Sequence, residues 1–384
     1  MIPLSIPHLD GNEWKYVKEC LDTGWVSSAG SYVTRFEEMV AEFSGAKYGI
    51  AASNGTSGLH MALHVLDVNR DHHVIVPNIT FIASANSVAY TGAAPIFIDV
   101  DPHTWQMDLD LLERFVEEEC RMNDEGACVC QSTGKVVRAI MPVHVLGNMC
   151  DMERLQTIVS KKNIDIVEDA SESLGSYYKG KHSGNLGKMG VFSFNGNKII
   201  TTGGGGVMVT DDEALAKRAK HLTTQAKVNP ETYWHDEIGF NYRLVNVLAA
   251  MGVAQMEQLP TFIEKKKYID RVYREKLEGI GDIRFQKVEE YIDSNCWLVT
   301  IQSREQSQLL EALKAEKIIA RPFWTPMNQL PMFTNHIYYT EHDHSRTIHQ
   351  ECLSIPCSVS ISDEQLSSVS ETITAVFQKI TESC

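Results

Sequence analysis

Between residues 46 and 210 the sequence alternates short apolar runs with stretches of helical periodicity. The runs are rich in β-branched or aromatic residues and bounded by Gly, Asp or Pro, which is typical of buried strands. They cover residues 48–52, 74–77, 95–100, 139–145, 164–167, 190–194 and 206–210. Alternation of this kind predicts an α/β fold, in which helices cover both faces of a mainly parallel, seven-stranded sheet.

The pattern changes near Leu259 and Pro260, where a charged helical stretch begins. Residues 296–301 have the character of a strand, and residues 119–136 are expected to form a surface excursion between a helix and a strand. We therefore expect a large α/β domain over residues 1–258 and a smaller α+β domain over residues 259–384.

A last helix is predicted from Ser362 onward. Ser362 and Gln365 have the spacing of a capping box, in which each side chain bonds the other residue's backbone N–H group. The helix carries an apolar stripe of Leu366, Val369, Ile373, Val376 and Ile380.

Charge and cysteine usage exclude several classes of protein. The chain has 35 basic and 50 acidic residues, a net charge of −15, which argues against a nucleic-acid or anionic-membrane surface. Nine scattered cysteines without zinc-finger spacing predict reduced thiols, and hence a cytoplasmic protein. We expect no signal peptide and no membrane span.

The first strand end offers a candidate phosphate site. Residues 53–58 read Ser-Asn-Gly-Thr-Ser-Gly and lead into an apolar helix. Free N–H groups and hydroxyls at a helix N-terminus are a usual way to hold a phosphate. A plain N-cap with flexible glycines explains the same residues.

Two acids, Glu168 and Asp169, follow the run 164–167. Such a pair can act as the counter-ion of a cationic ring, as part of a metal site completed by His144, or as a helix cap. The segment supplies too few ligands for a metal ion, and we expect none.

Lys198 follows the run 190–194 and precedes four consecutive glycines, residues 203–206. A partly buried lysine loses its charge readily and is available for Schiff-base chemistry, although most lysines on turns are surface residues. The glycine run fits neither a Walker A loop nor a dinucleotide fingerprint.

Together, a phosphate cradle, an acid and a Schiff-base lysine are the parts that a pyridoxal phosphate site requires. The acid keeps the pyridine nitrogen protonated, and an aromatic side chain covers the ring. Phe81, which follows the run 74–77, is placed for that contact.

With these residues identified, the chain resembles the DegT/DnrJ/EryC1/StrS sugar aminotransferases, pyridoxal phosphate enzymes of fold type I. The resemblance covers nearly the whole chain, from Thr23 to Pro356. It is carried by the motifs at residues 53–56, 80–81, 99–101, 143–147, 168–170, 193–203 and 239–243.

The resemblance implies roles for individual residues. Lys198 would bind the cofactor and transfer protons, and Asp169 would pair with the pyridine nitrogen. Asn241 would reach the phosphate from the other subunit of a homodimer with shared active sites. The other implied cofactor contacts are Gly55, Thr56, Ser57 and Ser193 at the phosphate, Phe81 on the ring, and Glu172 near its phenolic oxygen. The expected substrate contacts are Trp25, Arg243, Trp324 and Asn328.

Three positions depart from the family pattern. Glu172 stands where relatives have Gln or His, Gly204 replaces a usual Glu, and Asn328 replaces a common His. Glu172, the four glycines and residues 119–136 are similar to the enzymes of bacillosamine and legionaminic acid synthesis.

The expected function is transfer of the amino group of L-glutamate to C4 of a UDP-linked 4-keto-6-deoxy-N-acetylhexosamine. Alternatives within the family are GDP-4-keto-6-deoxymannose, as in perosamine synthesis, and a TDP-3-keto sugar. A dehydratase is disfavoured because those relatives have His in place of Lys198. A non-catalytic pyridoxal phosphate-binding regulator and a nicotinamide-dependent oxidoreductase are the alternatives from other classes.

Overall fold

The computed structural model of this chain describes residues 1–229 and 231–383, and its central element is a ten-stranded sheet. Eight of the strands follow the order β1-β11-β10-β7-β6-β2-β3-β16. In that order their bounds are Tyr48–Ala52, Gly206–Thr210, Met189–Ser193, Asp165–Asp169, Val136–Ile140, His72–Pro77, Ala94–Ile98 and Tyr338–Tyr339.

The sheet is mainly parallel, as predicted. Every pair from β10 to β16 is parallel, whereas β11 pairs antiparallel with both β1 and β10. All seven predicted runs are strands of this sheet, but the sheet has ten strands and not the predicted seven. Strand β16 and a short hairpin complete the sheet, and neither has a long apolar run that marks it in the sequence.

The hairpin lies within residues 119–136. Its strands β4 (Cys120–Met122) and β5 (Cys128–Cys130) pair with each other, and β5 joins β6. Cys120, Cys128 and Cys130 are buried against the sheet, so the segment is more than the expected surface excursion. The eight cysteines within the described residues are free thiols.

Helices cover both faces of the sheet, because side chains alternate between the faces along each strand. Val74 and Val76 face helices on one side, and Ile75 faces helices on the other. The first side carries α3 (Gly55–Val65), α4 (Ala83–Tyr90) and α7 (Glu213–Thr223). The second carries α2 (Ser31–Ser44), α5 (Leu109–Glu118) and α6 (Met152–Ser160).

The C-terminal part builds a second core around a four-stranded sheet of order β12-β14-β17-β15. These strands are Arg284–Phe285, Thr300–Gln302, Cys352–Ser354 and Arg321–Pro322, and the helices are α9 (Gln306–Ala315), α10 (His344–Glu351) and α11 (Asp363–Ser383). A third small sheet joins β13 (Ile292–Asp293) to β8 (Tyr177–Tyr178) and β9 (Lys181–His182).

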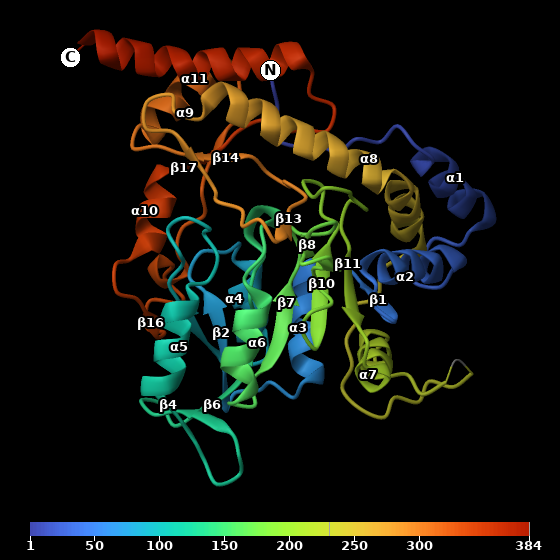
Figure 1. Cartoon of the computed structure of the whole chain (residues 1–384). Coiled ribbons are helices and arrows are strands. Elements are labelled where there is room, and N and C mark those ends of the chain that lie inside the picture. Colours follow the sequence, from blue (N-terminus) through green and yellow to red (C-terminus); the bar gives the residue numbers. More distant parts are fainter. Residues whose placement is uncertain (230, 384) are drawn as a thin grey trace.

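One long helix, α8 (Asn246–Leu277), crosses the predicted boundary at 258/259 and contains Pro260. Figure 1 shows it reaching from α11 at one end to α1 (Glu13–Thr23) at the other. Strands β13 and β16, from beyond residue 259, pair with strands from before it. The division into two domains stays a prediction. No helix within the described ranges is long and apolar enough to cross a membrane.

The predicted cap of the last helix is confirmed. The Ser362 hydroxyl accepts from the Gln365 N–H group at 3.2 Å, and the Gln365 side chain accepts from the Ser362 N–H group at 3.0 Å. Leu366, Val369 and Ile373 are buried below it.

Replacing Ser362 by Ala leaves the Gln365 N–H group without its acceptor. We expect the variant to lower the free energy of unfolding by about 1 kcal/mol, measured by urea denaturation. Ser368→Ala, on the exposed face of the same helix, is the control and should be neutral. Equal effects from both substitutions would contradict a stabilising cap.

Candidate active site

The strand ends that the sequence singled out meet at one cavity of about 230 Å³. It lies at the carboxyl ends of β2, β7 and β10, where open α/β sheets bind their ligands. Eight predicted residues line it: Gly55, Thr56, Phe81, Asp169, Glu172, Ser193, Lys198 and Trp324. Trp297, which the sequence reading did not single out, lines it as well.

The N-terminus of α3 forms one wall of the cavity. Asn54 caps the helix by accepting from the Ser57 N–H group at 2.8 Å, and the Ser57 hydroxyl accepts from the Asn54 N–H group at 3.2 Å. The N–H groups of Gly55 and Thr56 belong to the first turn, where a helix offers no internal acceptors. Ser57 is therefore engaged in the cap and does not line the cavity.

Gly55 lies so close to β10 that no side chain fits there. A Cβ atom on Gly55 would lie 2.8 Å from the Ser193 Cβ atom. The missing side chain leaves the helix N-terminus open beside the Ser193 hydroxyl. This cradle of N–H groups and hydroxyls has the donors that a phosphate requires.

Asp169, at the end of β7, is 4% exposed, and each of its two carboxylate oxygens accepts a hydrogen bond. Its Oδ2 atom accepts from the Ser84 hydroxyl at 2.6 Å, and its Oδ1 atom accepts from the Ser171 N–H group at 3.1 Å. Ser84 was missed by the sequence reading, because nothing near it in the chain links this serine on α4 to an acid 85 residues away.

Glu168 points to the opposite face of β7 and is completely buried. His144 Nε2 lies 2.9 Å from its Oε2 atom, and the N–H groups of Gly184, Leu186 and Gly187 donate to the carboxylate at 2.8, 2.6 and 2.7 Å. Burial raises the pKa of Glu168, but these hydrogen bonds outweigh it and hold the pKa below its usual value. Glu168 and His144 thus bond each other and tie the 184–187 turn to the sheet.

Glu172 is buried between a tight turn and Lys198. Its Oε2 atom accepts from the Leu146 N–H group at 2.9 Å, and its Oε1 atom lies 3.4 Å from Lys198 Nζ. Leu146 has a left-handed backbone with φ of 63°, a conformation that non-glycine residues adopt rarely and often near functional sites. Burial raises the pKa of Glu172, and the nearby ammonium of Lys198 only partly offsets that rise.

Lys198 is partly buried, with 11% of its side chain exposed, so the reading of a surface lysine is wrong. Its amine points between the Glu172 carboxylate and the indole face of Trp297, whose ring centre lies 4.1 Å from Nζ. The indole N–H group of Trp297 donates to the backbone carbonyl of Asn197 at 2.8 Å.

Two predicted substrate contacts are engaged elsewhere. Arg243 is 9% exposed at its side chain and forms an ion pair with Glu37, because its guanidinium lies inside the packing between α2 and β1. Asn328 exchanges two hydrogen bonds with Asn78, at 2.9 and 3.0 Å. Neither lines the cavity, and their roles toward a substrate stay predictions.

Trp25 and Asn241 are exposed residues outside this cavity. Trp25 is 59% exposed and lines a separate hollow with Tyr32 and Asn246. The exposure of Asn241 is what a residue that serves a neighbouring subunit requires, and that role stays a prediction.

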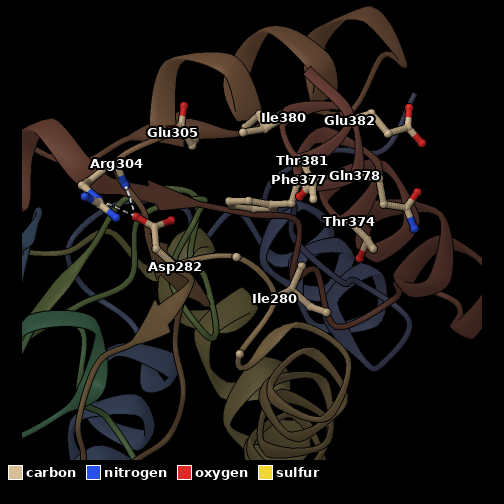
Figure 2. A pocket seen from close by; sticks show the side chains of 12 residues that line it. Ile280, Asp282, Arg304, Glu305, Thr374, Phe377, Gln378, Ile380, Thr381 and Glu382 are labelled. Carbon is tan, nitrogen blue, oxygen red and sulfur yellow. Dashed lines mark hydrogen bonds and ion pairs between the residues drawn. The ribbon is translucent and has the colours of Figure 1, made fainter. Parts of the chain in front are cut away.

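A larger groove, of about 710 Å³, lies far along the chain from these residues, between the turn after α8 and helix α11. Figure 2 shows Phe377 and Ile380 beside it and the ion pair between Arg304 and Asp282 at its edge. Among the residues that line this groove there is no lysine, so it offers no amine for Schiff-base chemistry.

The residues of the smaller cavity fit pyridoxal phosphate. The open α3 N-terminus suits the phosphate, Asp169 offers a buried carboxylate for a cationic ring nitrogen, and Lys198 presents an amine. Phe81, which is 55% exposed, supplies an aromatic face at the rim.

Comparison with known proteins decides the family. The model of the "DegT/DnrJ/EryC1/StrS aminotransferase family" matches residues 7–374. The chain belongs to this family. Its members are pyridoxal phosphate-dependent enzymes, and the chain is a sugar aminotransferase with that cofactor.

Individual relatives agree over nearly the whole chain. A GDP-perosamine synthase of Escherichia coli O157:H7 is 37% identical over 97% of both chains, and one of Caulobacter vibrioides is 38% identical over 87% of both. A solved sugar aminotransferase of Streptococcus pneumoniae in its PLP form is 25% identical over 99% of both, with a TM-score of 0.89. These relatives do not support the expected UDP-hexosamine subgroup.

Glu168 provides a test of which acid is structural. We expect Glu168→Gln to lower the free energy of unfolding at pH 7 by about 3 kcal/mol, because an amide cannot accept all four hydrogen bonds. Since the folded-state pKa lies below the unfolded value near 4.5, this contribution is present above pH 4.5 and is lost as the pH falls through the folded pKa.

Urea denaturation at several pH values measures this difference. Glu153→Gln, which breaks an exposed pair with Lys179, is the matched control and should cost less than about 1 kcal/mol. A stability difference for Glu168→Gln that persists undiminished at pH 3 would contradict the assignment.

Proposed function

We propose that this protein transfers the amino group of L-glutamate to C4 of a GDP-linked 4-keto-6-deoxy sugar. The convergence of Lys198, Asp169 and the open N-terminus of α3 on one cavity carries the aminotransferase chemistry. Three GDP-perosamine synthases among the relatives favour GDP-4-keto-6-deoxymannose over the UDP-linked hexosamine. A TDP-3-keto sugar has less support.

When bound, pyridoxal phosphate supplies a carrier for the amino group and an electron sink for charge at the substrate carbon. Lys198 is the general base that takes the proton from Cα of glutamate, and the acid that returns a proton at C4 of the sugar. The Asp169 carboxylate, oriented by Ser84 and Ser171, holds positive charge on the ring nitrogen. Gly55, Thr56 and Ser193 anchor the phosphate, and Phe81 orients the ring.

We also propose a homodimer in which Asn241 serves the partner's active site. The segment after α7 extends away from the sheet in Figure 1. Several of its apolar side chains are exposed. Tyr233, Trp234 and Ile238 are 95, 68 and 87% exposed, which is typical of a surface that a partner covers. The free thiols fit a cytoplasmic enzyme.

A two-stage spectroscopic assay tests the substrate. L-glutamate should change the visible absorbance of the bound cofactor, and after its removal GDP-4-keto-6-deoxymannose alone should restore it. Restoration only by UDP-4-keto-6-deoxy-N-acetylglucosamine or a TDP-3-keto sugar would overturn the GDP assignment. No response to any amino donor would favour a non-catalytic regulator, and a response to nicotinamide nucleotides would favour an oxidoreductase.

Removing the amine should abolish transfer. We expect Lys198→Ala to reduce the rate about 10²- to 10⁴-fold while cofactor remains bound, because no other amine in the cavity can move the proton. Lys188→Ala, which removes an exposed lysine outside the cavity, is the control. Full activity of Lys198→Ala would contradict the mechanism.

The acid is tested separately. Asp169→Asn should lower the rate at least about 100-fold, because a neutral amide does not hold charge on the ring nitrogen. Ser84→Ala keeps the carboxylate and loses one hydrogen bond, so its rate should fall much less. Equal rates in Asp169→Asn and the unaltered protein would refute the role of Asp169.

A further inference from the structure

Trp297, from the C-terminal part of the chain, contacts the Lys198 amine with its indole ring. It is 2% exposed, and its indole ring centre lies 4.1 Å from Lys198 Nζ. At that distance the negative face of an indole attracts an ammonium group. On another side of the same amine, the Glu172 carboxylate lies 3.4 Å away. The amine is therefore held between a carboxylate and an aromatic face.

The backbone next to Trp297 is hydrogen-bonded to the segment that follows β7. Asn295, which is fully buried, donates to the carbonyls of Glu172 and Leu174, both at 2.9 Å. Its own Oδ1 atom accepts from the backbone N–H group of Trp297 at 3.0 Å. Cys296, between them, has a left-handed backbone with φ of 52°. Asn295 thus bonds the backbone at Glu172 and also orients Trp297.

A buried lysine bonds the backbone carbonyl of Trp297. Lys266 of α8 is 2% exposed, and its Nζ atom donates to the carbonyls of Trp297 at 2.8 Å and Cys357 at 2.6 Å. A buried ammonium requires such acceptors. Trp297 is consequently bonded at its N–H group, its carbonyl and its indole nitrogen, so its ring has little freedom to move away from Lys198.

We propose that Trp297 is a positioning residue, which together with Glu172 holds the Lys198 amine in place whenever that amine is not bonded to the cofactor. The inference rests on the proposed function. A base that transfers protons must stay within reach of the reacting carbon, and a flexible lysine side chain does so only if other groups restrict it. The indole face and the carboxylate provide that restriction without taking part in the proton transfer.

The first test uses cofactor-free protein and needs no sugar. Trace acetic anhydride acetylates uncharged lysine amines, and peptide mass spectrometry compares Lys198 with the other lysines. Because Trp297→Leu removes the indole face that holds the Lys198 amine, the amine becomes freer to meet the reagent, and we expect Lys198 labelling to rise about 2- to 30-fold. Trp297→Phe keeps an aromatic face and should give a smaller rise. Trp14→Leu, at a 75% exposed position, is the matched control and should leave Lys198 unchanged.

Unchanged Lys198 labelling in Trp297→Leu, in protein whose melting curve shows it folded, overturns the proposal. A rise of equal size at all lysines reports unfolding of Trp297→Leu. In that case Trp297→Phe decides: a selective rise at Lys198 supports the proposal, and unchanged Lys198 labelling overturns it. A selective rise at Lys198 supports it.

The second test separates positioning from binding. With L-glutamate as the only substrate, Trp297→Leu should lower the maximal rate of the absorbance change about 10-fold and leave its half-saturating concentration unchanged. A higher half-saturating concentration with an unchanged maximal rate would make Trp297 a binding residue and overturn the proposal. Failure of every keto sugar would instead refute the proposed function, since neither test of Trp297 contains one.

Discussion

The parallel register of β2, β6, β7 and β10 is the constraint on which the site depends. Parallel strands end at the same edge, so the residues after each of them are neighbours in space. The first strand reaches this edge by another route. Gly206 of β11 pairs with Ala52 of β1 and with Ser193 of β10, and two antiparallel steps restore the direction of β10. A Cβ atom on Gly206 would lie 2.6 Å from the Asn54 carbonyl oxygen, so only glycine admits this approach.

Three buried acids within residues 168–172 are stabilised in three different ways. Glu168 receives hydrogen bonds from backbone groups and His144, Asp169 from Ser84 and Ser171, and Glu172 from Leu146. Only Asp169 and Glu172 face the cavity, because Glu168 points to the other face of β7. The charge of Glu172 is further balanced by Lys198. A buried carboxylate without such partners is strongly disfavoured, and these contacts therefore determine which acid can meet a cofactor.

The C-terminal part supplies what the strand ends lack. Trp297 and Trp324 close the cavity from beyond the predicted domain boundary, while β16 extends the large sheet itself. Asn295, beside β13, connects the two parts through buried hydrogen bonds to the carbonyls of Glu172 and Leu174, and Lys266 on α8 holds the carbonyl of Trp297. The reactive amine is therefore positioned by both parts of the chain.

Local sequence determined the strands, the caps and the residues at each strand end, because apolar periodicity and short-range hydrogen bonding act over a few residues. It also carried the family motifs around Lys198 and Asp169. Tertiary structure alone decided that Ser84 bonds Asp169, that Trp297 contacts Lys198, and that Arg243 pairs with Glu37. The physical reason is that these contacts join residues on different elements. Their partners are chosen by the packing of helices and sheets, which leaves no local pattern in the sequence.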